Sequence, residues 1–96
     1  MNDLEVKIQA VEVTDDRLTF DLVDGRSISV PLTFYPSLLL ATPEERRTFE
    51  IEGHNVHWPL LDVDLGSICL LSGAKEPSAS VRRAYDRQAA RQAAVA

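Results

Sequence analysis

The chain has 96 residues, which is enough for one domain but leaves no room for a second hydrophobic core. Hydrophobic residues make up 45% and charged residues 26%, a balance typical of a globular domain and not of a disordered chain. The net charge of −5 is unevenly spread. Residues 1–74 carry five basic and thirteen acidic side chains, a net of −8, whereas residues 75–96 carry five basic and two acidic, a net of +3. An acidic body repels a phosphate backbone, so residues 1–74 are a poor nucleic-acid surface.

The sequence shows neither a targeting signal nor a pair of cysteines, and this indicates a cytoplasmic protein. No apolar stretch approaches the roughly 20 residues that a membrane span needs, and the polar start Met1-Asn2-Asp3 is not a signal peptide. Cys69 is the single cysteine, so it has no intramolecular disulfide partner, and its apolar neighbours favour a buried, inert thiol over a reactive one.

The N-terminal part of the chain predicts a strand that contains a bulge. Apolar residues alternate with polar ones from position 4 to position 8, and the apolar phase then slips by one residue at positions 11 and 13. A bulge near Gln9-Ala10 would return the same face to the core without ending the strand.

Two further strands complete a predicted three-stranded antiparallel meander. Leu18, Phe20 and Leu22 form the inward face of the second strand, and the third covers about residues 28–32. Asp24-Gly25 between them predicts a two-residue type I′ turn, in which both central residues need positive φ. Pro31 donates no ladder hydrogen bond, so it either faces the unpaired side of its strand or ends it.

Short helices and a second hairpin are predicted after the meander. Residues 37–40 have the length of one helical turn. Thr42 at the N-cap, Pro43 at N1 and Glu45 at N3 form a capping box that starts a helix over about residues 43–48. Gly53 marks the turn of the second hairpin, and residues 67–71 fit either a short helix or a terminal strand.

Residues 74–96 predict a basic C-terminal helix that follows the domain of residues 1–73. Alanine, arginine and glutamine dominate this segment, and all three favour helix. Val81, Tyr85 and Ala89 recur every fourth residue and give a thin apolar stripe. A helix of this length is marginal alone in water, so it either docks or frays.

An ordered set of short phrases resembles the DUF2442 family of small uncharacterised bacterial domains. The phrases cover residues 1 to about 73 and are Asp24-Gly25-Arg26, Val30-Pro31-Leu32, Tyr35-Pro36, Leu38, Ala41-Thr42-Pro43-Glu44, Arg46, His57-Trp58-Pro59, and Asp62 with Asp64. The resemblance implies a compact α+β domain with antiparallel strands and one or two short helices. It implies no catalytic residues, because none is established for the family.

The resemblance also carries expectations about partners and two departures. Some members of the family carry a further helix-turn-helix domain, which residues 74–96 are too short to supply, and some appear to be encoded beside another small uncharacterised protein. Ser37 stands where the family commonly has a basic residue, and Leu60 stands where it commonly has an acidic one. Both departures weaken an inference of a charged surface site.

One cluster suggests metal binding or acid–base chemistry, namely His54, His57, Asp62 and Asp64. A spacing of three on an extended chain sends His54 and His57 to opposite faces, which argues against convergent ligands. Asp62 and Asp64 also fit the polar face of a strand. No nucleophile with an adjacent base, glycine-rich phosphate loop or cofactor motif is present, so we expect no enzyme, metal or cofactor.

Tyr35 and Trp58 each precede a proline and allow two interpretations. Either both rings bury against the meander, or they form an exposed recognition patch, since aromatic side chains anchor interfaces. The core is favoured for Trp58, because a chain with six aromatic residues has few large side chains to spare.

Arg83, Arg87 and Arg91 recur every fourth residue and predict a basic stripe on the C-terminal helix. The stripe fits a solvated tail, a contact with the acidic body of this or a neighbouring subunit, or a contact with nucleic-acid phosphates. Arg82 brings the arginines of this segment to four, and four arginines beside an acidic body are a weak nucleic-acid footprint.

We therefore expect an α+β domain that acts as a protein-interaction module, by pairing with itself or with a separately encoded small protein, as the regulatory half of a two-protein system. A nucleic-acid-associated regulator is the first alternative, and an enzyme built on His57, Asp62 and Asp64 is the second. The candidate interaction surface comprises Tyr35, Trp58, Asp62, Asp64, Arg83, Arg87 and Arg91.

Overall fold

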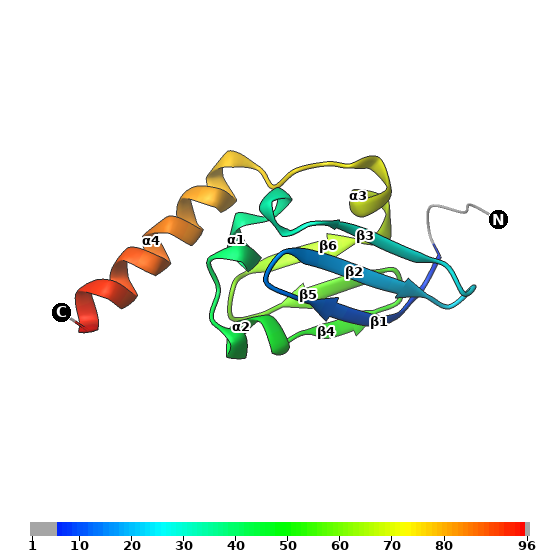
Figure 1. Ribbon diagram of the computed structural model, residues 1–96, viewed down its shortest axis with the longest axis horizontal. Coiled ribbons are helices and arrows are strands. Elements are labelled where there is room, and N and C mark those ends of the chain that lie inside the picture. The colour runs from blue at the N-terminus through cyan, green and yellow to red at the C-terminus, as the bar shows by residue number, and fades with distance from the viewer. Residues whose placement is uncertain (1–5, 96) are drawn as a thin grey trace.

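The computed structural model, which describes residues 6–95, contains two antiparallel three-stranded sheets and several short helices, with a long helix at its C-terminal end (Figure 1). The chain therefore has the α+β fold that the sequence predicts. The first sheet has the order β1-β2-β3 and the second the order β4-β5-β6. The strands are β1 (Ile8–Val13), β2 (Arg17–Leu22), β3 (Ser27–Pro31), β4 (Glu50–Glu52), β5 (Asn55–Trp58) and β6 (Val63–Gly66).

The first sheet is the predicted meander. Leu18, Phe20 and Leu22 of β2 are buried, because alternate side chains of a strand point to the same face. The pairing of β1 with β2 shifts register between Ile8 and Ala10, which confirms the predicted bulge. Pro31 ends β3, which is an edge strand of the sheet.

The turn at Asp24-Gly25 differs from the prediction. Gly25 has φ of 95°, but Asp24 does not have positive φ, so the type I′ prediction was wrong. The Leu22 N–H donates to the Arg26 carbonyl at 2.7 Å, which leaves a three-residue loop instead of a two-residue one. Such loops end in a left-handed residue, and glycine adopts that conformation without steric cost.

The second hairpin turns at Gly53, as predicted. Glu52 pairs with Asn55, so the loop has two residues, and Gly53 has φ of 63°. Val56 and Trp58 of β5 and Val63 and Leu65 of β6 are buried. Asp62 lies in the turn before β6 and not on the strand, with φ of 54°.

The short helices begin where the capping signals indicate. The 3-10 helix η2 (Leu32–Phe34) and α1 (Pro36–Leu39) follow β3 directly. In α2 (Pro43–Arg47), the Glu45 N–H donates to the Thr42 hydroxyl while the Thr42 N–H donates to the Glu45 carboxylate. This reciprocal pair confirms the predicted capping box.

The two sheets share one hydrophobic core. β1 lies beside β4, and α3 (Ser67–Ser72) lies against both β3 and β6. The Ile8 N–H also donates to the Gly53 carbonyl at 2.8 Å, which ties the first sheet to the second hairpin. Residues 67–71 thus form part of a helix, one of the two predicted alternatives.

The last helix, α4 (Ser78–Val95), extends away from the sheets (Figure 1) and makes the molecule 51 Å long against 23 and 21 Å across. It docks against α1. Its docked side contains Ala84, which is 2% exposed, whereas Tyr85 is 56% exposed and Ala89 is also exposed. The apolar stripe through Val81, Tyr85 and Ala89 is therefore not the docking face. None of the helices within residues 6–95 is long and apolar enough to cross a membrane.

Candidate functional site

A surface pocket of about 440 Å³ lies where β6 and α3 meet residues 74–77 and the first turns of α4. Its apolar lining comes from Tyr35, Val63, Leu65, Cys69, Ala74 and Pro77. Three parts of the chain that are distant in sequence thus form one concave surface, the usual setting for a ligand or partner site.

Residues 74–77, which form one wall of this pocket, are hydrogen-bonded to the body of the protein. The Tyr35 hydroxyl donates to the Ala74 carbonyl at 2.8 Å, and the Glu76 N–H donates to the Phe34 carbonyl at 2.9 Å. Burial, followed by the charges of Cys69 and Glu76, raises the pKa of Tyr35 from 10.0 to about 12. The phenol is therefore neutral over a wide pH range and serves as a donor.

The Glu76 carboxylate joins α1, residues 74–77 and α4. It accepts hydrogen bonds from the Ser37 N–H at 2.8 Å and from the hydroxyls of Ser37 and Ser80. Ser37 is 1% exposed. A charged acceptor in this position satisfies one of the free N–H groups at the start of α1.

Charged side chains of both signs stand around the pocket. Asp62 and Asp64 belong to β6 and the turn before it, and Lys75 and Arg83 belong to the segment before α4 and to α4 itself. The His57 Nδ1 lies 2.7 Å from the Asp64 carboxylate, and the Lys75 ammonium lies 5.3 Å from the centre of the Phe34 ring. Within residues 6–95, the side chains of Asp62 and Arg83 make no hydrogen bond or ion pair.

The structure brings together four of the seven residues that the sequence singles out as an interaction surface. Tyr35, Asp62, Asp64 and Arg83 all line the pocket. Trp58 does not line the pocket; it is fully buried, and its ring N–H donates to the Arg46 carbonyl at 3.1 Å. The Trp58 ring thus belongs to the core, the alternative that the sequence favoured, and Tyr35, 2% exposed, forms no exposed patch with it.

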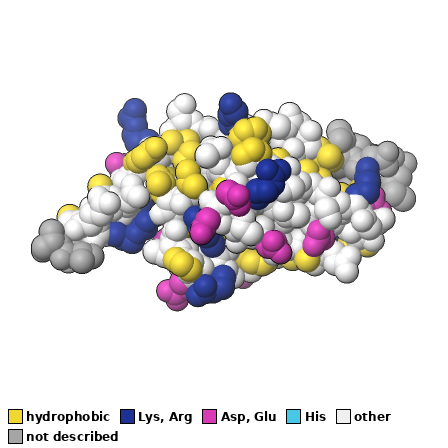
Figure 2. Space-filling view, in the orientation of Figure 1, with side chains coloured by type: hydrophobic (Ala, Val, Ile, Leu, Met, Phe, Trp, Pro, Cys, Tyr) yellow, Lys and Arg dark blue, Asp and Glu magenta, His cyan; other side chains and the backbone are white. Residues whose placement is uncertain are grey.

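The arginine stripe of α4 is divided between solvent and the body. Arg83 is exposed, whereas the Arg91 guanidinium donates to the Leu40 carbonyl at 2.6 Å and lies 3.4 Å from the Glu45 carboxylate. The Nη2 atom of Arg87 is buried without a hydrogen-bond partner in the part of the chain described. On the face shown in Figure 2, acidic and basic side chains are interspersed. The stripe is therefore not a continuous exposed basic surface.

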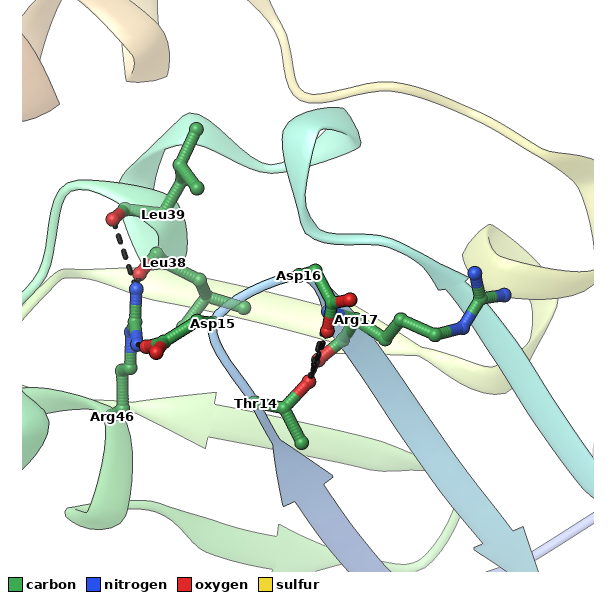
Figure 3. A network of polar contacts seen from close by, with 7 residues as sticks. All are labelled: Thr14, Asp15, Asp16, Arg17, Leu38, Leu39 and Arg46. Carbon is green, nitrogen blue, oxygen red and sulfur yellow. Dashed lines mark hydrogen bonds and ion pairs between the residues drawn. The ribbon is translucent and has the colours of Figure 1, made fainter.

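Arg46 is a further partly buried arginine, and its contacts join parts of the fold to one another. Its Nε donates to the Leu38 carbonyl at 2.9 Å and its Nη2 to the Leu39 carbonyl at 3.0 Å, at the end of α1. Its Nη1 meets the Asp15 carboxylate at 3.0 Å in the β1–β2 turn. Figure 3 shows Arg46 spanning the space between α1 and this turn. Arg46 thus joins α2 to both elements and closes the last turn of α1.

The histidine–aspartate cluster is only partly assembled. His57 and Asp64 are paired across β5 and β6, while His54 lies in the β4–β5 turn. Among residues 6–95, no three His, Cys, Asp or Glu side chains form a set that could hold a metal ion.

Sequence reasoning missed Glu76 and Lys75 as parts of the site. Both precede Pro77 and the start of α4, a place where an acidic residue often compensates free N–H groups. That signal indicates a helix start but not the partner Ser37, which is 39 residues away in the chain.

Comparisons with known proteins agree with this fold. The family model described as "Protein of unknown function (DUF2442)" matches residues 8–76. A crystal structure of a protein of unknown function from Rhodospirillum rubrum is similar at 26% identity and a TM-score of 0.64, covering 80% of this chain and 98% of that one.

A solution NMR structure of an uncharacterised protein from Chromobacterium violaceum is similar at 25% identity and a TM-score of 0.62, covering 75% of this chain and 70% of that one. No curated protein matches the chain. Because the family model covers well over half of the sequence, the chain belongs to the DUF2442 family of proteins of unknown function.

Proposed function

We propose that this protein is an interaction module that binds itself or a separate small protein through the outward face of α4. The observation that carries the proposal is Tyr85, a large aromatic side chain that is 56% exposed on a helix extending away from the body. Tyr85 makes no ring contact or hydrogen bond within residues 6–95. Rigidly held aromatic side chains are frequent anchors of protein interfaces, since they bury a large area at a small cost in conformational entropy.

The way in which α4 is fixed supports this assignment. Glu76 holds its start and Arg91 holds its distal half, so the outward face has a defined position relative to the sheets. Ala89 and Ala90, in the turn after Tyr85, are also exposed, and small residues let a partner backbone approach closely. A partner would therefore meet a preformed surface, which reduces the entropic cost of binding. The proposal assigns no catalysis to the protein.

Nucleic-acid binding by the arginine stripe is the weaker alternative. Arg91 is occupied by Leu40 and Glu45, and Arg87 is partly buried, so few charges remain for phosphates. Such binding requires an affinity that falls steeply with salt.

The test combines affinity purification with a matched pair of variants. The full chain, tagged at its N-terminus, is purified from its native host after nuclease treatment, and its own oligomeric state is measured by light scattering. Tyr85→Ser removes the exposed anchor of α4. Val23→Ser is the control, because Val23 is 61% exposed in the β2–β3 loop.

We expect either a near-stoichiometric partner protein in the purified sample or a dimer of this chain. The Val23→Ser variant should still form this complex, and the Tyr85→Ser variant should not. A monomer that recovers no protein would overturn the interaction proposal. A partner that Tyr85→Ser still binds would overturn the assignment to α4. Material that disappears on nuclease treatment would move the nucleic-acid alternative ahead.

A further inference from the structure

The pocket between β6 and the start of α4 has the size and lining of a small-molecule site. Its volume of about 440 Å³ lies within the range of roughly 300–1,000 Å³ that is usual for ligand pockets. Six of its lining residues are apolar or aromatic, and the buried Tyr35 ring is one of them. An apolar group of a few carbon atoms is therefore the part of a ligand that the pocket would enclose.

The charges around the pocket restrict the ligand further. Asp62 and Asp64 come from β6 and the turn before it, whereas Lys75 and Arg83 come from the segment that leads into α4 and from α4 itself, so the two signs of charge are carried by different elements of the lining. A ligand with a single charge is attracted by one pair and repelled by the other, whereas a ligand with both charges is attracted by each. We propose that this pocket binds a small apolar zwitterion, a free amino acid or dipeptide, with its ammonium facing Asp62 and Asp64 and its carboxylate facing Lys75 and Arg83.

Two of these four charges have no other partner. The side chains of Asp62 and Arg83 make no hydrogen bond or ion pair within residues 6–95. Glu76 also lines the pocket and keeps its negative charge, but its carboxylate oxygens already accept hydrogen bonds from Ser37 and Ser80. The Lys75 ammonium lies 5.3 Å from the centre of the Phe34 ring.

The wall opposite β6 is fixed before any ligand arrives. The Tyr35 hydroxyl holds Ala74, and the Phe34 carbonyl and Ser37 hold Glu76. A ligand therefore orders no segment of the chain when it binds, and less of its binding free energy is lost to conformational entropy.

This site is independent of the interaction proposed for α4. Arg83 and Tyr85 are two positions apart on a helix, so they point in directions about 200° apart. A zwitterion in the pocket and a protein on the Tyr85 face would occupy different sides of α4, and either proposal can fail alone.

The test is a titration of the isotope-labelled full chain followed by NMR. The probes are leucine and leucyl-leucine, with N-acetyl-leucine and leucinamide as analogues that carry one charge only. The variant Asp62→Asn/Arg83→Gln removes one charge of each sign from the pocket, and asparagine tolerates the positive φ of 54° at position 62. The control Asp86→Asn/Arg82→Gln makes the same two changes at exposed positions of α4 that do not line the pocket.

We expect saturable shifts of the amide signals of residues 62–65 and 74–76 with leucine or leucyl-leucine. Whichever of the two ligands binds with the higher affinity shows whether the site suits a single amino acid or a dipeptide. Loss of either ligand charge should weaken binding about two- to fivefold, the usual size of an exposed ion pair. The pocket variant loses two charges, and each loss should weaken the affinity for the ligand by a similar factor. The control variant should leave the affinity unchanged.

Shifts that do not saturate, that occur elsewhere, or that are equally strong with N-acetyl-leucine and leucinamide would overturn the proposal. So would equal weakening by the pocket variant and its control, because the effect would then be a general property of surface charge.

Discussion

The Glu76 carboxylate accepts a hydrogen bond from the backbone N–H of Ser37 at 2.8 Å, although the two residues are 39 positions apart. The Ser37 and Ser80 hydroxyls donate to the same carboxylate. One side chain thus connects the start of α1 with the start of α4. Together with the hydrogen bond from Arg91 to the Leu40 carbonyl, this contact holds α4 against the body, and it also holds one wall of the pocket.

Replacing Glu76 by glutamine is therefore expected to destabilise the protein by about 1–2 kcal/mol, since hydrogen bonds to a charged acceptor are stronger than those to a neutral amide. Urea unfolding followed by circular dichroism measures the change. Glu50→Gln is the matched control, because Glu50 is exposed on β4 and has no side-chain partner within residues 6–95. An equal effect of both variants would contradict the role given to Glu76.

Replacing Arg46 by methionine removes the donors to the Leu38 and Leu39 carbonyls. We expect a loss of about 2–3 kcal/mol, because carbonyl groups at the end of α1 then lose charged donors while the apolar stem is kept. Arg47→Met is the control, since Arg47 is exposed in the same helix.

A substitution at Asp15 distinguishes the contribution of the Arg46–Asp15 ion pair from that of the hydrogen bonds to the Leu38 and Leu39 carbonyls. The Asp15 side chain is fully exposed, so its ion pair with Arg46 is weak and Asp15→Asn should change stability by less than about 0.5 kcal/mol. A loss from Asp15→Asn as large as that from Arg46→Met would show that the ion pair, and not the carbonyl contacts, stabilises this region.

The features that the sequence predicted well are those that depend on neighbouring residues. The capping box at Thr42 and Glu45 closes within four residues, and the burial of Leu18, Phe20 and Leu22 follows from their alternation along one strand. The bulge after Ile8 could be predicted for the same reason, because a shift in apolar phase must be absorbed by one extra residue. The turn at Gly25 was located correctly, but its type depends on the pairing of Leu22 with Arg26.

The candidate site was only half predictable, because its parts meet through tertiary contacts. The spacing of Val81, Tyr85 and Ala89 suggested an apolar docking face, yet α4 docks through the small side chain of Ala84 and through Arg91 donating to a carbonyl. Neither Ala84 nor Arg91 can be recognised as a docking residue from the sequence, because the helix contains many alanines and arginines. The sequence placed Asp62, Asp64 and Arg83 in one candidate interaction surface together with Trp58, Arg87 and Arg91, and only the fold shows that the first three line one pocket while the others do not.

The contact of Arg91 with the Leu40 carbonyl predicts which part of α4 depends on the body. Arg91→Gln should leave the sheets intact but raise the rate of amide hydrogen exchange in residues 88–95, because it removes the hydrogen bond that ties the distal half of α4 to the Leu40 carbonyl. Arg82→Gln is the control, as Arg82 is exposed on the same helix. Unchanged exchange in Arg91→Gln would mean that the helix is stable without docking.

The stability of the protein should depend on pH in the alkaline range because of Tyr35. Burial raises the pKa of Tyr35 from 10.0 to about 12, so the folded state holds the phenolic proton more tightly than the unfolded state does. The resulting stabilisation is fully present below pH 10 and is lost as the pH rises toward 12. The free energy of unfolding should fall in this window by up to about 1.4 kcal/mol per pH unit.

Tyr35→Phe tests this expectation, because phenylalanine keeps the ring and removes the ionisable hydroxyl. At pH 8 the variant should be less stable by about 1 kcal/mol, since the hydrogen bond to the Ala74 carbonyl is lost. As the pH rises above 10, the wild type should lose stability faster, so the difference between the two proteins should shrink. Tyr85→Phe, which alters an exposed tyrosine, is the control in urea unfolding at each pH. A difference between wild type and Tyr35→Phe that stays constant up to pH 11 would contradict the burial of an un-ionised Tyr35 against residues 74–77.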